Sequence, residues 1–277
     1  MSPLDAVRGV ARELRDAGVP SPRVDAEYLV GHVLGLSRSE LYSAERDVAA
    51  EELERLGSFV ERRRTREPLA YILGEWGFRR LVLSVDRRVL VPRPETEVVV
   101  ERCLVRLREA GEPRVLDIGA GSGAIALAIA DEHPGARVVA VDHSAEALEV
   151  ARENLRRAGG GTDGRVEFVH GDVLAGQQGP FDLVVSNPPY VRPEELPTLE
   201  PEIRLYEPLE ALVGEGVTEA IAREAFGVLR PGGWLVLECG EGQADGLADL
   251  LVALGYSDVE KTRDLAGRER VVEARRP

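Results

Sequence analysis

Lysine is almost absent from this sequence of 277 residues. Lys261 is the only one, and arginine supplies the rest of the basic side chains. A P-loop needs a lysine directly after its glycines, so this class of phosphate site is excluded. Cysteine and histidine are also scarce: Cys103 and Cys239 stand alone in apolar surroundings, and the four histidines show no metal-ligand spacing. We therefore expect buried cysteines and no metal site.

Long apolar runs are missing too. No stretch approaches the roughly 20 apolar residues of a membrane span, and the amino terminus lacks a basic segment followed by an apolar one. We expect no membrane contact, a cytoplasmic location and a monomeric chain. The apolar content of 44% is enough for the cores of two domains.

Positive charge is deficient in one part of the chain only. Of 35 basic and 49 acidic residues, 15 of each fall within residues 1–90, so all of the net charge of −14 lies in the remainder. A domain that grips a nucleic-acid backbone normally carries a positive patch. Direct nucleic-acid binding is therefore not expected.

Residues 1–66 predict a small all-α bundle. Apolar residues recur at helical spacing, and Ser21 followed by Pro22 predicts an N-cap and the first residue of a helix. The bundle ends in the basic run Arg62–Arg66. This run is either a solvated helix end or a docking patch for an RNA-associated partner.

Residues 67–90 predict a β-hairpin that links two domains, because apolar residues alternate from Trp76 to Val85. A proline-punctuated loop, Leu90–Glu97, then leads into a helix. It is either a simple helix entry or one wall of a ligand pocket.

A glycine-rich turn follows a strand at Val115–Ile118 and opens a helix of small residues. Such a turn lets a ligand approach the backbone and offers it the N–H groups of the helix start. Its spacing is G-x-G-x-G instead of the G-x-G-x-x-G of dinucleotide sites, which disfavours a pyrophosphate ligand. The turn consists of Gly119, Ala120, Gly121, Ser122 and Gly123.

Acidic residues end the next two strands. Asp142 can accept both ribose hydroxyls of a nucleoside, although an Asp that only caps the next helix would look the same. Asp172 can accept from an adenine amine while Val173 covers the ring. Three successive strand ends thus favour a nucleoside ligand.

The fourth strand, Phe181–Ser186, ends in Asn187, Pro188, Pro189 and Tyr190. Asn187 Oδ1 and the Pro188 carbonyl can accept both N–H groups of a planar amide or amine, which can stack on Tyr190. A proline-rich turn without chemistry is the alternative.

Strands and helices alternate after residue 90, which predicts an α/β fold with a mostly parallel, Rossmann-like sheet, helices on both faces and an antiparallel tail. Within it we expect a helix over 212–229, a turn at 230–233 and a strand over 234–239. The predicted domains are 1–66, 67–90 and 91–277.

The order of these motifs resembles class I S-adenosylmethionine-dependent methyltransferases that modify planar nitrogens. Nearly the whole chain is similar to the bacterial peptide chain release factor N5-glutamine methyltransferases. The matching stretches are Pro68–Gly74, Val91–Glu97, Asp117–Gly123, Asn187–Tyr190, and Tyr206–Pro208 with Ala211 and Leu212. The chain departs from the family at Arg80 and at Gly214–Val217, where the family usually has glycine and an Asp-Gly pair.

By this resemblance the fold is a class I methyltransferase domain after a helical substrate-binding domain. The five residues of the glycine turn, Asp142, Asp172, Val173 and Asn187 would bind S-adenosylmethionine. Asn187–Tyr190 would hold the glutamine of a release factor's Gly-Gly-Gln motif, with Asn187, Pro188 and Tyr190 as catalytic residues, so the enzyme would act on translation termination. The alternatives are an adenine-N6 methyltransferase acting on nucleic acid, a small-molecule methyltransferase and a non-enzymatic scaffold.

Overall fold

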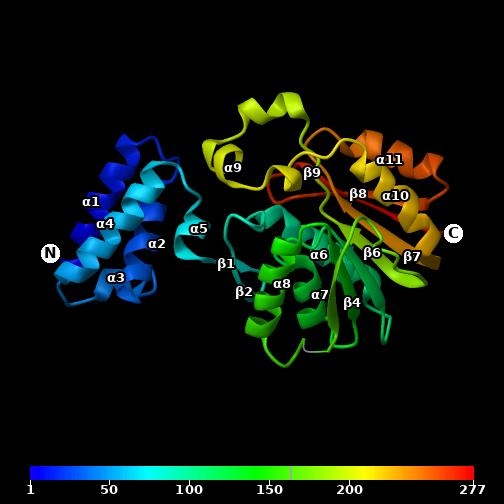
Figure 1. Cartoon of the computed structure of the whole chain (residues 1–277), viewed down its shortest axis with the longest axis horizontal. Coiled ribbons are helices and arrows are strands. Elements are labelled where there is room, and N and C mark those ends of the chain that lie inside the picture. Colours follow the sequence, from blue (N-terminus) through cyan, green and yellow to red (C-terminus); the bar gives the residue numbers. More distant parts are fainter. Residues whose placement is uncertain (163) are drawn as a thin grey trace. The chain divides into compact units, whose positions relative to one another are not determined.

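The computed structural model describes residues 1–162 and 164–277, which form two compact units (Figure 1). Unit 1 comprises Met1–Gly74 and Leu199–Tyr206, and unit 2 comprises Glu75–Thr198 and Glu207–Pro277. The chain therefore crosses between the units three times, since a short segment returns to unit 1 from the middle of unit 2. None of the described helices is long and apolar enough to cross a membrane.

Unit 1 is helical, as the apolar spacing predicts. Its core is formed by the buried stripes of three longer helices, including Leu14, Leu29 and Val60. Ser21 is the N-cap residue and Pro22 the first residue of the second helix, as predicted, and the Ser21 side chain makes no capping hydrogen bond. The helices are α1 (Pro3–Asp16), α2 (Pro22–Leu34), α3 (Glu40–Ser43), α4 (Ala50–Arg64), α5 (Leu69–Leu73) and α9 (Pro201–Tyr206).

The basic run at the end of α4 faces inward in part. Arg63 is 5% exposed and bonds both Asp25 (2.7 Å) and Glu202 of α9 (2.8 Å). Arg66 also bonds Glu202, at 2.6 Å. The expectation of a solvated helix end is wrong for Arg63, because it pairs with a carboxylate 139 residues further along the chain. These bonds attach α9 to the helical bundle.

Unit 2 begins with the predicted hairpin, formed by β1 (Glu75–Phe78) and β2 (Leu81–Ser84). Its two-residue turn accommodates the departure at Arg80. Arg79 takes the left-handed conformation (φ 51°), and its guanidinium pairs with Glu132. The hairpin therefore forms without a glycine at this turn.

In the described part of unit 2 seven strands form the main sheet, in the order β5-β4-β3-β6-β7-β9-β8. β9 runs antiparallel to both of its neighbours, and the other pairs are parallel, which confirms the predicted sheet and tail. The strands are β3 (Arg114–Ile118), β4 (Arg137–Asp142), β5 (Val166–His170), β6 (Phe181–Ser186), β7 (Leu229–Glu238), β8 (Ser257–Arg263) and β9 (Glu269–Arg275).

Helices cover both faces of this sheet (Figure 1). Leu116 and Ile118 of β3 pack in one core with Ile221 of α10 (Val217–Val228) and Leu251 of α11 (Ala244–Ala253). The opposite face carries α6 (Pro94–Leu107), α7 (Ala124–Glu132) and α8 (Ala145–Ala158). β3 is therefore covered on both faces, and its residues from Val115 to Ile118 are all buried, Asp117 included.

Two predicted boundaries are wrong. The helix expected from residue 212 begins at Val217, because Gly216 takes a left-handed conformation (φ 74°) and the preceding residues form a 3₁₀ turn, η2 (Leu209–Ala211). The turn expected at 230–233 is instead an irregularity within β7, which already pairs with Phe181 at Leu229. A further 3₁₀ segment, η1 (Pro193–Thr198), follows the Asn-Pro-Pro-Tyr motif.

Candidate active site

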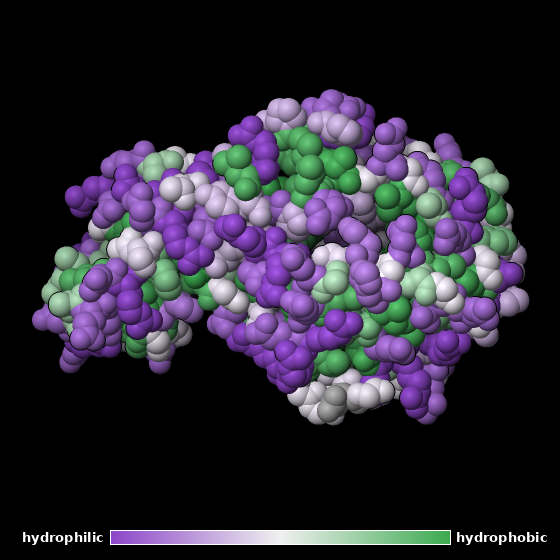
Figure 2. Space-filling view, viewed as in Figure 1, coloured by the Kyte–Doolittle hydropathy of each residue, from purple (hydrophilic) through white to green (hydrophobic). Residues whose placement is uncertain are grey.

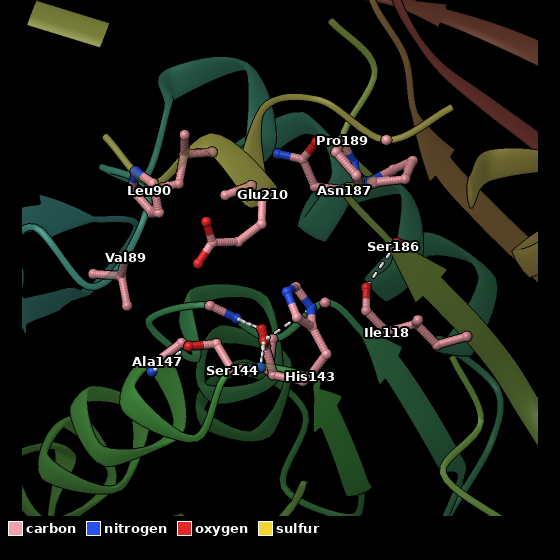
Figure 3. A pocket seen from close by; sticks show the side chains of 18 of the residues that line it. Val89, Leu90, Ile118, His143, Ser144, Ala147, Ser186, Asn187, Pro189 and Glu210 are labelled. Carbon is pink, nitrogen blue, oxygen red and sulfur yellow. Dashed lines mark hydrogen bonds and ion pairs between the residues drawn. The ribbon is translucent and has the colours of Figure 1, made fainter. Parts of the chain in front are cut away.

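A cavity of about 360 Å³ lies in unit 2 at the carboxyl ends of β3, β4 and β6. β3 lies between β4 and β6, so the strand order reverses here, and this is where open α/β sheets bind ligands. Figure 3 shows Asn187 and Pro189 on one side of the cavity and Ser144 and Ala147 on another. The Glu210 side chain points into the space between them.

The glycine turn lies at the cavity wall as predicted. Gly119, Ala120, Gly121 and Ser122 all line it, and Gly119 and Gly121 have positive φ angles of 80° and 53°. The Gly119 and Ala120 N–H groups both donate to the Val141 carbonyl, at 2.9 and 3.0 Å. These bonds fix the turn to the neighbouring strand and hold its backbone against the cavity.

Gly123 has a different role in the structure. It is the N-cap of α7, with φ 80°, and it is not among the cavity-lining residues of the described chain. A Cβ here would lie 3.0 Å from Phe168 Cζ and 3.3 Å from Ala151 Cβ. This glycine is required for close packing of α7 against its neighbours.

Asp142 ends β4 and lines the cavity. Its carboxylate accepts from Gly121 N at 2.7 Å and from Ser144 N at 2.8 Å. The side chain thus joins the glycine turn to the start of α8. The sequence left a ligand contact and a capping role open for Asp142; in the structure the N-cap of α8 is Ser144, whose side chain accepts from Ala147 N, and Asp142 lines the cavity.

Asp172 and Val173 line the cavity as well, after β5. Val173 has a positive φ of 38°, and its N–H donates to Asp172 Oδ1 at 3.0 Å. Asp172 is exposed, while Val173 is half-buried. The structure therefore brings the ends of three consecutive strands to one cavity, as the motif order predicts.

The Asn-Pro-Pro-Tyr motif reaches the cavity with three of its four residues. Asn187, Pro188 and Pro189 line it, and Tyr190 is not among the lining residues, so the ring that was expected to stack on the substrate does not face the cavity. The Tyr190 carbonyl accepts from Gln243 Nε2 at 3.0 Å, and its hydroxyl donates to Glu238 at 3.3 Å. A pocket of this kind, between a glycine turn and a proline-fixed asparagine, suits a nucleoside on one side and a planar nitrogen on the other.

Comparison with known proteins covers almost the whole chain. Residues 5–74 match the PrmC N-terminal domain family, and residues 98–200 match the methyltransferase small domain family. A release factor glutamine methyltransferase of Deinococcus radiodurans is 44% identical over 278 residues, covering 98% of each chain. One of Caulobacter vibrioides is 41% identical over 265 residues, covering 94% of this chain and 91% of that protein.

The chain belongs to the release factor glutamine methyltransferase family. Solved structures with less sequence similarity share its fold. A methyltransferase of Pyrococcus furiosus matches with a TM-score of 0.53 and 22% identity, covering 71% of this chain and 89% of that one. A 16S rRNA N2 G1207 methyltransferase of T. thermophilus, solved with AdoMet and guanosine, matches with a TM-score of 0.53 and 20% identity, covering 73% and 50%. These two matches establish the methyltransferase fold.

In this member of the family, the loop before α6 forms a wall of the cavity. Pro92, Arg93 and Thr96 line it, so the loop is more than a helix entry. Arg93 Nη2 donates to both oxygens of buried Glu207, at 2.7 and 2.6 Å. Burial raises the pKa of Glu207, against the attraction of Arg93. This ion pair fixes Glu207 beside the loop before α6. It therefore also positions the start of the segment that leads to Glu210.

Thr96 and Glu238 are two candidate functional residues that the sequence did not predict. Glu238 is fully buried at the end of β7 and accepts from Thr96 Oγ1 at 2.8 Å. Burial raises the pKa of Glu238 to about 7. A buried carboxyl whose pKa lies near neutrality is typical of functional sites. A glutamate near the end of an otherwise apolar strand, Trp234–Cys239, could have indicated a functional residue. Its partner Thr96 could not have been identified, because it lies 142 residues earlier in the sequence.

Proposed function

We propose that this enzyme transfers a methyl group from S-adenosylmethionine to the side-chain amide N5 of the glutamine in the Gly-Gly-Gln motif of peptide chain release factors. The observation that carries the proposal is the meeting of Asn187–Pro189 with the glycine turn and Asp142 around one cavity. The relatives that cover nearly the whole chain are release factor glutamine methyltransferases, which supports the same substrate.

The residues at the cavity fit S-adenosylmethionine. Each oxygen of Asp142 accepts one backbone N–H and keeps a lone pair, so the carboxylate can also accept two ribose hydroxyls. The Gly119–Ser122 backbone permits close approach of the ligand, and Val173 offers an apolar contact for the adenine ring. Asp172, which also lines the cavity, would accept from the adenine amine.

Asn187 and Pro188 orient the acceptor. Asn187 Oδ1 and the Pro188 carbonyl accept the two N–H groups of the glutamine amide, which aims its nitrogen at the methyl carbon. S-Adenosylmethionine carries this methyl on a positive sulfur, so a C–N bond forms while the C–S bond breaks, its electron pair stays on sulfur, and the nitrogen loses a proton to water. The two acceptors stabilise the positive charge that develops on nitrogen, and no general base is required.

The test is methyl transfer from labelled S-adenosylmethionine to an unmethylated release factor. The controls are the same factor with its Gly-Gly-Gln glutamine changed to alanine, and adenine-containing duplex DNA. We expect label on the intact factor alone, and no label on it with the Asn187→Ala enzyme. Because the glycine turn, Asp142, Asp172 and Val173 remain at the cavity, this variant should still bind S-adenosylmethionine in calorimetry, although it lacks one of the expected contacts. Label on DNA, or on the glutamine-free factor, would refute the proposed acceptor.

Unit 1 is proposed to bind the release factor outside the Gly-Gly-Gln loop. Hydrophilic side chains cover most of its visible surface (Figure 2), and Arg63 is already occupied by Asp25 and Glu202, so it is not the contact residue. A short Gly-Gly-Gln peptide lacks the parts of the factor that unit 1 would bind. We therefore expect a KM at least tenfold higher for the peptide than for the intact factor, and equal KM values would contradict a binding role for unit 1.

A further inference from the structure

A chain of hydrogen bonds runs behind the Asn-Pro-Pro-Tyr motif. Asn187 Nδ2 donates to Thr96 Oγ1 at 3.4 Å, and Thr96 Oγ1 donates to Glu238 Oε2 at 2.8 Å. The Tyr190 hydroxyl donates to the other oxygen of Glu238 at 3.3 Å. One buried carboxylate therefore holds the motif at its first and last residues.

The direction of these bonds depends on a single proton. An ionised carboxylate only accepts hydrogen bonds, so Thr96 must give its hydroxyl hydrogen to Glu238. The Thr96 oxygen can then only accept, which requires the NH₂ group of Asn187 to face it. As a result, Asn187 Oδ1 faces away from Thr96 and is available to accept from a substrate.

Protonation of Glu238 permits the reverse order. A carboxylic acid can donate to the Thr96 oxygen, which frees the hydroxyl hydrogen to point at Asn187. The amide of Asn187 then turns its oxygen toward Thr96, and its NH₂ group faces the substrate. Two N–H donors would meet there, and the glutamine amide would lose one of its two acceptors.

We propose that Thr96 and Glu238 are positioning residues, and that ionised Glu238 sets the orientation of the Asn187 amide in which it can accept from the substrate nitrogen. The link to catalysis rests on the proposed function. The hydrogen-bond arrangement itself does not, because it involves this chain alone.

The surroundings of Glu238 bring its pKa close to neutral pH. Burial raises the pKa of Glu238 to about 7, and the negative charge of Glu95 on α6 acts in the same direction. The bonds from Thr96 and Tyr190 and the positive charge of Arg270 on β9 oppose this rise. The adjacent Cys239 thiol stays neutral, since burial raises its pKa to about 11. The Asn187 amide should therefore change orientation near neutral pH.

The sequence offers a direct test, because it contains only two asparagines, Asn154 and Asn187. Protein labelled with ¹⁵N-asparagine gives just two side-chain amide signals. Asn154 is a matched internal control: it is buried, and its amide donates to the Ser84 and Ser122 carbonyls at 3.0 and 2.9 Å. We expect the Asn187 signal to titrate with a midpoint near pH 7 while the Asn154 signal stays constant.

In Glu238→Gln the Asn187 titration should vanish. It should persist in Glu273→Gln, which alters a buried carboxylate on β9 that pairs with Arg102 and Arg106. An Asn187 signal that does not titrate in the wild type, or that still titrates in Glu238→Gln, would overturn the proposal.

Enzyme kinetics test the consequence for catalysis. We expect kcat for methyl transfer to fall tenfold per pH unit below about pH 7 in the wild type, and this acid limb to be absent in Glu238→Gln. Thr96→Val should lower kcat at least tenfold with unchanged affinity for S-adenosylmethionine, and Thr96→Ser should restore it. A full kcat in Thr96→Val would refute the positioning role. If the amide titrates but no release factor is methylated, the proposed function fails while the hydrogen-bond arrangement stands.

Discussion

Asp117 should make this enzyme less stable as the pH rises, and its replacement by asparagine should reverse the effect. The side chain is fully buried in β3, below the glycine turn. Its Oδ2 accepts from Ala126 N at 3.1 Å, while its Oδ1 has no hydrogen-bond partner among the described residues. Burial, reinforced by nearby Asp142, raises the pKa of Asp117 from 3.8 to about 7.

The size of the effect follows from this shift. Between pH 4 and pH 7 the folded protein holds a proton on Asp117 that the unfolded chain has released, so the free energy of unfolding decreases as the pH rises. A difference of about 3 pKa units at 1.36 kcal/mol each corresponds to about 4 kcal/mol of lost stability above pH 7. An asparagine keeps the bond to Ala126 but leaves an NH₂ group unpaired, which costs about 1–3 kcal/mol. We expect Asp117→Asn to be more stable at pH 8 by about 1–3 kcal/mol.

Tryptophan fluorescence in urea can measure this difference. The two tryptophans, Trp76 and Trp234, both lie in unit 2, as does Asp117, so the signal reports the unfolding of this unit. Unfolding curves at pH 5, 6, 7 and 8 should show the advantage of Asp117→Asn growing with pH and disappearing near pH 5.

A control of opposite sign is available in the same unit. Burial acts to raise the pKa of Asp264, but its bonds to Arg268 outweigh this, and the pKa is lowered. Asp264 therefore contributes stability above its unfolded pKa, and this contribution is lost on acidification. Asp264→Asn should thus reduce stability at pH 8. If the difference between Asp117→Asn and the wild type does not change with pH, the assigned titration of Asp117 is wrong.

Three further substitutions test the site and the fold. Asp142→Ala removes a carboxylate that fixes the glycine turn and is proposed to bind the ribose, so calorimetry should show S-adenosylmethionine binding about 10–100-fold more weakly; unchanged binding would contradict that role. Gly123→Ala puts a Cβ 3.0 Å from Phe168 at a positive φ, and urea unfolding should show a loss of about 1–3 kcal/mol. Glu202→Gln removes the negative charge that pairs with both Arg63 and Arg66. Hydrogen exchange of the α9 amides should become at least about tenfold faster, which corresponds to a decrease of about 1.4 kcal/mol in the local free energy of opening. Unaltered exchange would show that other contacts hold α9.

The sequence predicted the sheet and the place of the site because both follow from local patterns. Alternating strands and helices require parallel pairing, and parallel strands present their carboxyl ends at one edge. Asp142, Asp172 and Asn187 each end a strand, so their meeting at one cavity could be expected without knowledge of any contact.

The Thr96–Glu238 bond and the Arg63–Glu202 pair could not be predicted in this way. Each joins residues more than 130 positions apart, and neither partner stands in a pattern that identifies the other. A run of arginines also suggests exposure, since charged side chains are rarely buried unless they are paired. The start of α10 was misplaced because apolar residues continue before Gly216, whose backbone conformation fixes the boundary.

The return of α9 to unit 1 affects how this protein can be recombined. Cutting the chain after Gly74 does not separate unit 1 from unit 2. Residues 199–206 also belong to unit 1, and in the sequence they lie between the two segments of unit 2. A chimaera that exchanges only residues 1–74 would bring a foreign set of side chains to Glu202, and a chain shortened to its second unit would lose the arginines that neutralise this carboxylate. A functional chimaera should therefore take both segments of unit 1, the amino-terminal helices and α9, from the same parent protein.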